Sequence, residues 1–438
     1  MDEPLGIALI GCGTVGSGVA RLLVEQPERL RARAGRRLEL RRVLVRNLDK
    51  PRSVNLPQRL FTADLRQILD DSGIQVAVEL AGGIDWARHT VLDLLGAGKH
   101  VVTANKALLS EHGREVFDAA RRHGLCVAFE ASVAGGVPII AALAESLTAN
   151  QILSIKGIVN GTCNYILTQM TEHDLTYDAA LAEAQAKGYA ESDPTLDVDG
   201  TDAAHKLAIL AQIAFGVNMR GSQIGRRGIA RIDAMDIRFA RDLGYTVKLL
   251  SEAWLEPTTQ LLALHVAPVL LRKLSPLALV RGAYNAIHVQ ADAVGDTLYY
   301  GKGAGQMPTA SAVVADLIDI AVGRAQRTFQ TLRLWSENGS DTPIRIRPTS
   351  EVRTRFYLRS LVSDRPGVLA EIARVLAEHG ISISSVMQHE ALEEHEGDTV
   401  PLVVMTHTAR TGSFQDAARI IERLPFVAAP CVYFPVAD

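Results

Sequence analysis

The stretch Ile7–Gln26, "IALIGCGTVGSGVARLLVEQ", joins a short apolar run to a helical pattern through a glycine-rich turn. The run Ile7–Ile10 has the length and composition of a buried parallel strand. The glycines that follow fit G-x-G-x-x-G: the first permits a tight turn, the second lets the backbone approach a pyrophosphate, and the third lets helix and strand pack closely. A glycine turn with only a structural role is the alternative. The strand and amphipathic helix around the motif favour a dinucleotide site.

Amide groups at the start of the helix would face the cofactor phosphates. The residues expected there are Gly11, Gly13, Thr14, Val15 and Gly16.

The end of the second expected strand bears on which nicotinamide cofactor is bound. In "LELRRVLVRNLDK", Val45 is followed by Arg46 and Asn47, where an acidic residue would normally bind the ribose 2′-hydroxyl. A cation at this place suits a 2′-phosphate, so NADP is favoured over NAD. NAD stays possible, because Arg46 could instead face solvent.

Alternating elements extend this unit. Strand-like runs at 74–83, 100–109 and 126–136 are separated by helical stretches at 86–96 and 111–123, which predicts a doubly wound α/β sheet. Ligands of such sheets lie beyond the carboxyl ends of the strands. This rule puts four residues near the cofactor cleft: Gly82, Asn105, Lys106 and Glu130. Lys106 is either a site residue or a surface lysine at a helix start.

Composition narrows the protein class. A chain of 438 residues, 47% hydrophobic and 22% charged, predicts about three globular domains. A net charge of -3 excludes a large basic field for nucleic acid or anionic lipid. The four cysteines form no C-x-x-C pair, so neither a zinc site nor a disulfide framework is indicated. The N-terminus lacks a basic secretory start, and the longest apolar run, Val133–Ala144, is too short for a membrane span, so a cytoplasmic protein is expected.

The acidic stretch Glu191–Lys206, "ESDPTLDVDGTDAAHK", suggests chemistry. Aligned as a calcium loop, it would put Lys206 where a bidentate glutamate is needed, which excludes that loop. A helix from Thr201 instead makes Asp202 and Lys206 neighbours at i and i+4. They are either an ordinary helical ion pair or part of an acidic pocket for a substrate ammonium. In such a pocket a protonated Lys206 could donate to a carbonyl oxygen as hydride arrives.

Several long motifs together resemble homoserine dehydrogenase, from the N-terminus to about residue 325. They are "GCGTVG", "TANKALL", "EASVAGGVPII", "NGTCNYIL", "KGYAESDPTLDVDGTDAAHKLAIL" and "GKGAGQMPTASAVVAD". The resemblance implies a Rossmann-type domain followed by an α+β catalytic and dimerisation domain. It also implies interconversion of L-aspartate 4-semialdehyde and L-homoserine with NAD(P), a step in threonine, methionine and isoleucine biosynthesis.

The same resemblance implies roles for single residues. Lys206 would be the proton donor with Asp202 beside it, and Lys106 would lie between cofactor and substrate, in proton transfer or only in binding. Substrate would bind at Glu191, Asp202 and Gly188, and Gly303 would contact the cofactor. A sodium site would be formed by the side chain of Glu130 and the backbone carbonyls of Val133, Gly135 and Val137.

The last part of the chain is predicted to form a separate domain. After the polar stretch Ser336–Pro343, the sequence predicts a βαββαβ order with helices at 368–379 and 413–424 and a last strand at 427–434. The segment "VSDRPGVLAEIARVLAEHGISI" resembles the ACT domain, which implies an amino-acid effector, with L-threonine expected as the feedback inhibitor, and a homodimer or homotetramer. The predicted boundaries are 1–136 for the cofactor domain, 137–325 for the catalytic domain, 326–350 for a linker and 351–438 for the ACT domain.

Two other functions compete with this interpretation. A semialdehyde dehydrogenase working through a thiohemiacetal would need a cysteine nucleophile, and Cys163 at a helix start is the candidate. A nucleotide-binding regulatory protein would use the acidic cluster only as structure.

Overall fold

The computed structural model describes residues 3–332, 334–335, 344–388 and 399–437. The chain divides into two compact units. The first comprises Met1–Leu153, Asp202–Ile224 and Asn285–Ile344, and the second comprises Ser154–Thr201, Gly225–Tyr284 and Arg345–Asp438. The predicted polar linker stretch Ser336–Pro343 lies outside the described residues. No helix in the described ranges is long and apolar enough to cross a bilayer.

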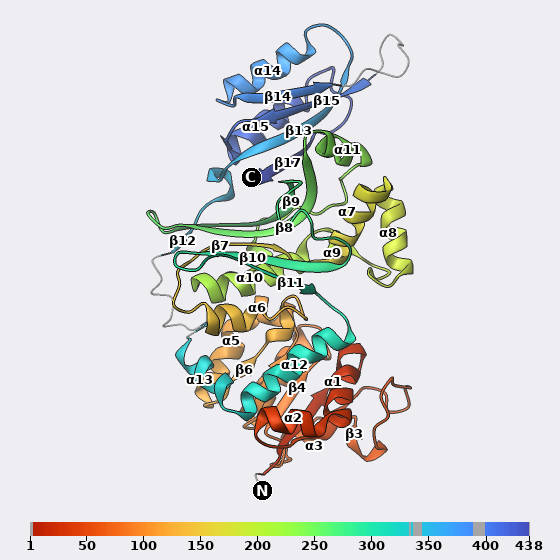
Figure 1. Cartoon of the computed structure of the whole chain (residues 1–438), viewed down its shortest axis with the longest axis vertical. Helices are drawn as coiled ribbons and strands as arrows, with labels where there is room; N and C mark the ends of the chain where they lie inside the picture. The colour runs from red at the N-terminus through yellow and green to blue at the C-terminus, as the bar shows by residue number, and fades with distance from the viewer. Residues whose placement is uncertain (1–2, 333, 336–343, 389–398, 438) are drawn as a thin grey trace. The chain divides into compact units, whose positions relative to one another are not determined.

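The first unit is built on a six-stranded sheet whose strand pairs are all parallel. In sheet order the strands are β3 (Phe61–Thr62), β2 (Leu38–Leu44), β1 (Leu5–Ile10), β4 (Val76–Glu79), β5 (His100–Thr103) and β6 (Val127–Ala128). Figure 1 labels β3, β4 and β6 of this sheet. This order runs outward from β1 in both directions, so the β1–β4 boundary is the switch point at which doubly wound sheets bind ligands. The predicted fold class is confirmed.

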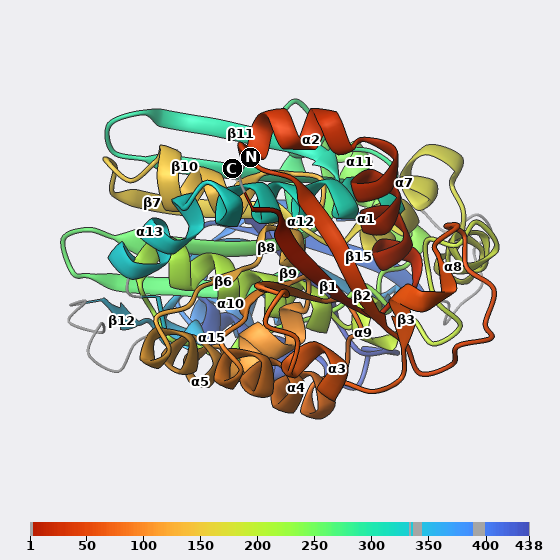
Figure 2. The same cartoon turned by 90° about the horizontal axis from the view of Figure 1, so that it is seen from below.

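Helices cover both faces of this sheet, as Figure 2 shows: α1, α2 and α12 lie on one side of the strands, and α4 and α5 on the other. The helices of this layer arrangement are α1 (Thr14–Glu25), α2 (Pro27–Ala34), α3 (Arg66–Leu69), α4 (Asp85–Gly96), α5 (Lys106–Arg122), α12 (Gln306–Ala321) and α13 (Arg324–Thr331). A Cβ at Gly18 would lie 3.0 Å from the Cβ of Ala310, so α1 and α12 touch closely. Helix α12, which follows Gly303 in the sequence, therefore packs on the nucleotide-binding part.

All three predicted strand-like runs were too long, since β4 covers only Val76–Glu79 of the run at 74–83. The run at 100–109 ends at Thr103, because the side chain of Asn105 accepts a hydrogen bond from the Leu108 amide and starts α5. The run at 126–136 is extended only at Val127–Ala128. It then turns into a 3-10 helix, Glu130–Ser132, whose first amide donates to the buried carboxylate of Asp316. In the last two places a side-chain hydrogen bond to the backbone ends the strand.

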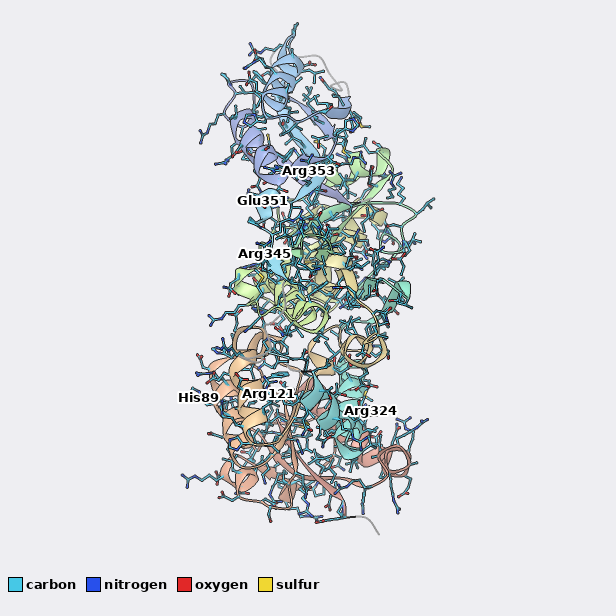
Figure 3. The ribbon with its side chains drawn as sticks, turned by 90° about the vertical axis from the view of Figure 1, so that its left-hand side faces the viewer. His89, Arg121, Arg324, Arg345, Glu351 and Arg353 are labelled. Atoms are coloured by element: carbon cyan, nitrogen blue, oxygen red, sulfur yellow. The ribbon has the colours of Figure 1, made fainter. Side chains whose placement is uncertain are left out.

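An aromatic cluster fixes the end of the described segment after α13. Trp335 is buried against Phe117 and Phe129, with ring centroids 4.5 and 5.8 Å away. Arg121, labelled in Figure 3, donates to the carbonyl of Leu334 at 2.9 Å. The predicted linker range therefore contains ordered, anchored structure on its N-terminal side.

The first unit also holds α6 (Ile139–Ala141) with the π-helix Ala142–Ser146, the helix α10 (Thr201–Phe215), and the neighbouring strands β10 (Tyr284–Ala291) and β11 (Gly295–Lys302). The helix predicted from "TDAAHKLAILAQIAF" is α10. Its apolar residues Leu207, Ile209 and Leu210 are fully buried.

The second unit contains a mixed sheet that runs β7-β8-β9-β17-β13-β15-β14. Its strands are β7 (Ile152–Ile158), β8 (Tyr245–Glu256), β9 (Leu261–Arg272), β12 (Arg345–Ile346), β13 (Arg353–Ser363), β14 (Ile383–Gln388), β15 (Thr399–Thr406), β16 (Ala409–Arg410) and β17 (Val432–Ala437). The pair β9–β17 is parallel, and the main pairs on either side of it are antiparallel. Because β17 pairs with both β9 and β13, one sheet continues through the whole unit.

Six helices complete the second unit: α7 (Gly161–His173), α8 (Tyr177–Ala186), α9 (Thr195–Val198), α11 (Ala234–Asp242), α14 (Val368–Glu378) and α15 (Thr411–Ile421). The C-terminal order β13-α14-β14-β15-α15-β17 is the predicted βαββαβ arrangement, with β16 as a short addition. Phe356 and Phe414 stack at 3.9 Å in its core. The last strand begins at Val432 rather than at 427, because Pro430 lacks the amide that a ladder needs.

Candidate active site

The glycine-rich turn between β1 and α1 has the geometry that a phosphate needs. Gly11 has φ +100°, and a Cβ there would lie 2.9 Å from the carbonyl carbon of Leu80. A Cβ at Gly16 would lie 2.3 Å from the carbonyl oxygen of Gly11. Gly13 is exposed with open space around it and caps α1 without a side-chain hydrogen bond. The first amides of α1 therefore have no side-chain cap and can bind an anion.

A cavity of about 760 Å³ opens at this turn. It is lined by four of the predicted cofactor residues: Gly11, Gly13, Thr14 and Arg46. Val15, Gly16, Lys106 and Gly303 are not part of its lining. Polar lining residues that were not predicted from the sequence include Asn47, Lys50, Arg52 and Gln306. The positive charges in "RNLDKPR", shortly after β2, could have indicated two of these, Lys50 and Arg52.

One arginine folds the loop that follows Arg46. The guanidinium of Arg52 donates to the carbonyl oxygens of Asn47, Leu48 and Lys50, at 2.5, 3.2 and 2.7 Å. It also lies 4.7 Å from the ring centroid of Phe61. Arg52 is thus engaged in holding the loop, while Arg46 and Lys50 bring positive charge to the cavity wall.

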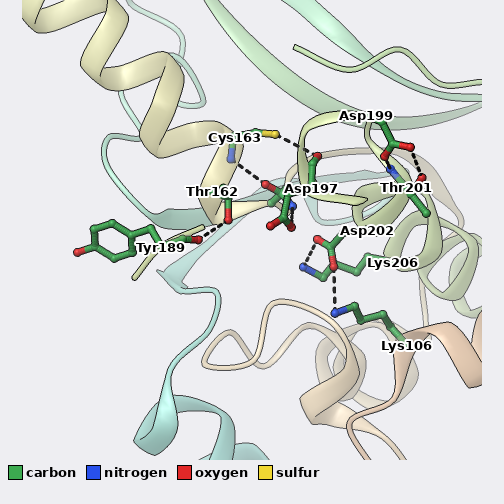
Figure 4. Close-up of polar contacts among 10 residues, drawn as sticks. Lys106, Thr162, Cys163, Tyr189, Asp197, Asp199, Thr201, Asp202 and Lys206 are labelled. Atoms are coloured by element: carbon green, nitrogen blue, oxygen red, sulfur yellow. Dashed lines mark hydrogen bonds and ion pairs between the residues drawn. The ribbon is translucent and has the colours of Figure 1, made fainter. Parts of the chain in front are cut away.

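Two lysine side chains of the first unit meet at the carboxylate of Asp202 (Figure 4). The Nζ atom of Lys206 donates to Oδ2 of Asp202 at 2.7 Å, and the Nζ atom of Lys106 lies 3.1 Å from Oδ1. The Asp202 side chain is 9% exposed, that of Lys206 12% and that of Lys106 41%. The predicted i, i+4 contact is confirmed, and Lys106 joins it from the start of α5. The two ammonium groups share one nearly buried carboxylate, which suits binding a polar group and moving a proton.

The helices that carry these residues are tied together next to the cluster. The Gly221 amide donates to the Ser110 hydroxyl at 2.9 Å, and the amide and hydroxyl of Ser222 donate to the Glu111 carboxylate. The ring of His205, the residue before Lys206, lies 3.8 Å from Oε1 of the same carboxylate. This clamp holds α5 and α10 at a fixed spacing.

The remaining residues of the acidic stretch lie in the second unit. Asp193 accepts from the amide and hydroxyl of Thr195, and Asp199 accepts from those of Thr201. The hydrogen bonds from Thr195 lower the pKa of Asp193. Asp197 accepts from the side-chain amide of Asn160 at 2.8 Å. These carboxylates shape the loop.

Two of the three residues predicted to bind substrate, Glu191 and Gly188, lie in the second unit, whereas the third, Asp202, lies in the first. Glu191 is exposed, and its carbonyl accepts from the side chain of Gln185 at 3.1 Å. Gly188 ends α8 with φ +72°. Both belong to the second unit, whereas Lys206 belongs to the first.

Cys163 is poorly placed for a thiol mechanism. It is fully buried near the start of α7, and its Sγ donates to the carbonyl of Asp197 at 3.2 Å. A nucleophilic thiol needs access and a setting that favours the thiolate. The structure therefore favours a packing role for Cys163.

Glu130, the side chain of the predicted sodium site, lies buried at the start of α6. Its carboxylate accepts from the amides of Ile140 and Ala141 at 3.0 and 2.7 Å. Burial nevertheless raises the pKa of Glu130 to about 7 and also raises the pKa of the buried Asp316 beside it. Among the residues that the structure describes, no lysine, arginine or histidine forms an ion pair with either carboxylate, and two such buried carboxylates suit a bound cation.

The backbone carbonyls predicted for this site differ in their hydrogen bonds. Within the described residues, the carbonyls of Val133 and Gly135 accept no backbone hydrogen bond, whereas that of Val137 accepts from Ile139 at 2.8 Å. No group of three or more His, Cys, Asp or Glu side chains in the described part of the chain could hold a metal ion. A cation here would therefore depend on backbone oxygens.

Three protein-family models match this chain, and together they cover most of its length. The family model "Homoserine dehydrogenase, NAD binding domain" matches residues 11–130, "Homoserine dehydrogenase" matches 138–318, and "ACT domain" matches 356–426.

Relatives match over their full length. Homoserine dehydrogenase of Pseudomonas aeruginosa is 43% identical over 98% of both chains. The crystal structure of a homoserine dehydrogenase from Thiobacillus denitrificans has a TM-score of 0.91 and 42% identity, over 100% of this chain and 99% of that one. A hyperthermophilic archaeal homoserine dehydrogenase in complex with NADPH has a TM-score of 0.61 and 25% identity, over 73% of this chain and 98% of its own.

Proposed function

Since this chain belongs to the homoserine dehydrogenase family, we propose that it catalyses the reversible, NADPH-dependent reduction of L-aspartate 4-semialdehyde to L-homoserine. The observation that carries the proposal is the Asp202 carboxylate shared by Lys106 and Lys206, in the same unit as a glycine-rich nucleotide turn. The product would feed the synthesis of threonine, methionine and isoleucine.

Lys206 donates the proton that the carbonyl oxygen of the substrate takes up. Bound NADPH supplies hydride to the aldehyde carbon. The carbonyl oxygen then gains negative charge, and the Lys206 ammonium donates a proton to it. Asp202 holds Lys206 in place, and Lys106 binds beside the reacting group. Homoserine oxidation reverses these steps. Glu191 and Gly188 bind the amino-acid part of the substrate.

The preference for NADP rests on the cations of the cofactor cavity. Arg46 and Lys50 both line it, and a 2′-phosphate would offset their charge. A related archaeal enzyme was solved with NADPH, which supports the assignment.

A sodium ion would be held by Glu130 and the carbonyls of Val133, Gly135 and Val137. It would neutralise the buried carboxylates and fix the loop between β6 and α6. This role is structural, and no proton or hydride passes through the ion.

The C-terminal ACT domain would bind an amino-acid effector, with L-threonine as the feedback inhibitor, in a homodimer or homotetramer. We keep the boundaries 1–136, 137–325, 326–350 and 351–438 for the cofactor, catalytic, linker and ACT parts.

The test is homoserine oxidation with NADP, followed as NADPH absorbance, for wild type and Lys206→Ala. Wild type should turn over, and Lys206→Ala should lose at least about 10²-fold in kcat, the typical share of a general acid. Arg374→Ala is the matched control, because it removes an exposed i, i+4 ion pair with Glu378 and should keep wild-type kcat. An inactive wild type, or a fully active Lys206→Ala, would refute the proposal.

A further inference from the structure

A buried carboxylate sits at the switch point of the nucleotide-binding sheet. Glu79, the last residue of β4, has no exposed surface. Its Oε1 accepts from the amides of Ala81 and Gly82, both at 3.0 Å, and its Oε2 accepts from the Thr103 hydroxyl at 2.8 Å. No lysine, arginine or histidine in the described residues pairs with it. Because such burial is costly for a carboxylate, its three donors must hold it firmly.

Asn105 closes this network into a ring. Its backbone amide donates to the Thr103 hydroxyl at 3.0 Å, and its side-chain amide donates to the carbonyl of Gly83 at 2.7 Å. Its side-chain oxygen accepts from the Leu108 amide at 3.1 Å and thereby caps α5. The ring therefore runs from Glu79 through the loop after β4 to Asn105 and back through Thr103.

The two sides of the ring carry two parts of the site. On one side, Leu80 and Ala81 line the cofactor cavity. On the other, Lys106 follows Asn105 directly as the first residue of α5 and reaches Asp202. Any shift of the ring would move the cavity wall and the ammonium group relative to each other.

We propose that Glu79 and Asn105 are positioning residues that set Lys106 against the cofactor cavity. Neither contacts substrate in this role, and both act through the hydrogen-bonded ring. The inference rests on the proposed function, because its main readout is homoserine turnover. A purely structural alternative is that Asn105 serves only as the helix cap.

Three variants of Asn105 separate these roles. Asn105→Asp keeps a capping oxygen but has no donor for the Gly83 carbonyl, and the hydroxyl of Asn105→Ser keeps the cap but lies one atom closer to the backbone and falls short of that carbonyl. Asn105→Ala loses both functions. If the ring positions Lys106, all three should lose about 10- to 100-fold in kcat, while only Asn105→Ala should show the lowered Tm of a lost cap. Full kcat in Asn105→Ser would overturn the proposal.

A double-mutant cycle tests whether the effect passes through Lys106. In a Lys106→Met background, Asn105→Ser and Glu79→Gln should cause little further loss of kcat, since the group that they position is gone. If each variant lowers kcat by the same factor in the Lys106→Met background as in the wild type, the proposal is overturned. NADPH binding measured by fluorescence separates the two hypotheses: a protein that binds NADPH but never oxidises homoserine refutes the proposed function, whereas normal turnover in the ring variants refutes only this inference.

Discussion

At the scale of the residue, two arginines of the same short loop differ in what they contact. Arg46 lines the cofactor cavity, whereas the guanidinium of Arg52 bonds three carbonyl groups of its own loop. Charge alone would not have separated them, because both follow the same strand. Hydrogen-bond partners separate them, and the difference predicts distinct kinetic effects.

Arg46→Ala should raise the KM for NADP by about 10-fold or more while leaving the KM for NAD almost unchanged, because only NADP carries the 2′-phosphate. Arg52→Met should raise the KM for both cofactors, because the loop itself loses its support. Steady-state kinetics with each cofactor checks this. Equal effects of Arg46→Ala on NAD and NADP would contradict it.

A buried lysine away from the cofactor cavity predicts a pH effect on stability. Lys248 donates to the side chain of Asn164 and to the carbonyl of Val280, and burial lowers its pKa to about 8. In the unfolded chain its pKa returns to about 10.4. Between these values the unfolded state binds more protons, so stability from this group rises with pH.

Compared with Lys248→Met, the wild type should therefore gain stability as the pH rises from 7 to 10, by about 3 kcal/mol at most. The measurement is the Tm of both proteins at several pH values. A difference that does not change with pH would contradict the assignment.

At the scale of the element, the spacing of α5 and α10 decides whether the lysines can share Asp202. The segment Gly221–Gln223 fills the space between them, and a Cβ at Gly221 would lie 2.5 Å from Cδ2 of His205 and 2.7 Å from the Ser110 hydroxyl. This close approach explains why the position requires glycine. The clamp is therefore sensitive to a single methyl group.

Gly221→Ala should push the two helices apart, lowering kcat by about 10-fold and the Tm by several degrees. Gly96→Ala is the control, because a Cβ there meets open space. Kinetics and thermal unfolding of both variants test the clamp. Wild-type kcat in Gly221→Ala would show that helix spacing does not limit turnover.

On the scale of the whole molecule, the ACT domain shares its sheet with the second unit's other strands. The pairing of β17 with β9 and β13 is reinforced by a buried ion pair, in which the Arg359 guanidinium donates to both carboxylate oxygens of Asp236 at 2.6 and 3.0 Å. The Tyr357 hydroxyl donates to the same carboxylate. Asp236 lies near the start of α11, so this ion pair joins the ACT domain directly to that helix.

Arg359→Met leaves the Asp236 charge buried with too few partners and should destabilise the protein by about 3 kcal/mol or more. The double variant Asp236→Leu with Arg359→Met should recover much of that stability but respond less to threonine, because the polar link is gone. Thermal unfolding and inhibition curves test both expectations. Unchanged threonine inhibition in the double variant would show that coupling takes another route.

Features that depend on residues close together in the sequence could be predicted from it, and features that depend on distant contacts could not. The glycine turn, the βαββαβ order and the Asp202–Lys206 pair were readable, since each follows from spacing within a few turns or strands. The strand predicted over 126–136 was too long, because the Glu130 amide and carboxylate bond to Asp316 and α6. The part that Arg52 plays in holding its loop could not be predicted either, since the sequence does not show which backbone carbonyl groups a guanidinium bonds.

By itself, the sequence determined the nucleotide-binding fold and the helix that carries Lys206, because period, glycine spacing and capping act over short distances along the chain. Only the tertiary structure decided that Lys106 meets Asp202, that Glu79 joins the ends of β4 and β5, and that β17 extends the sheet of β9. Those contacts arise when separate elements pack and bury their polar groups together. Their partners lie far apart in the sequence, so no local pattern encodes them.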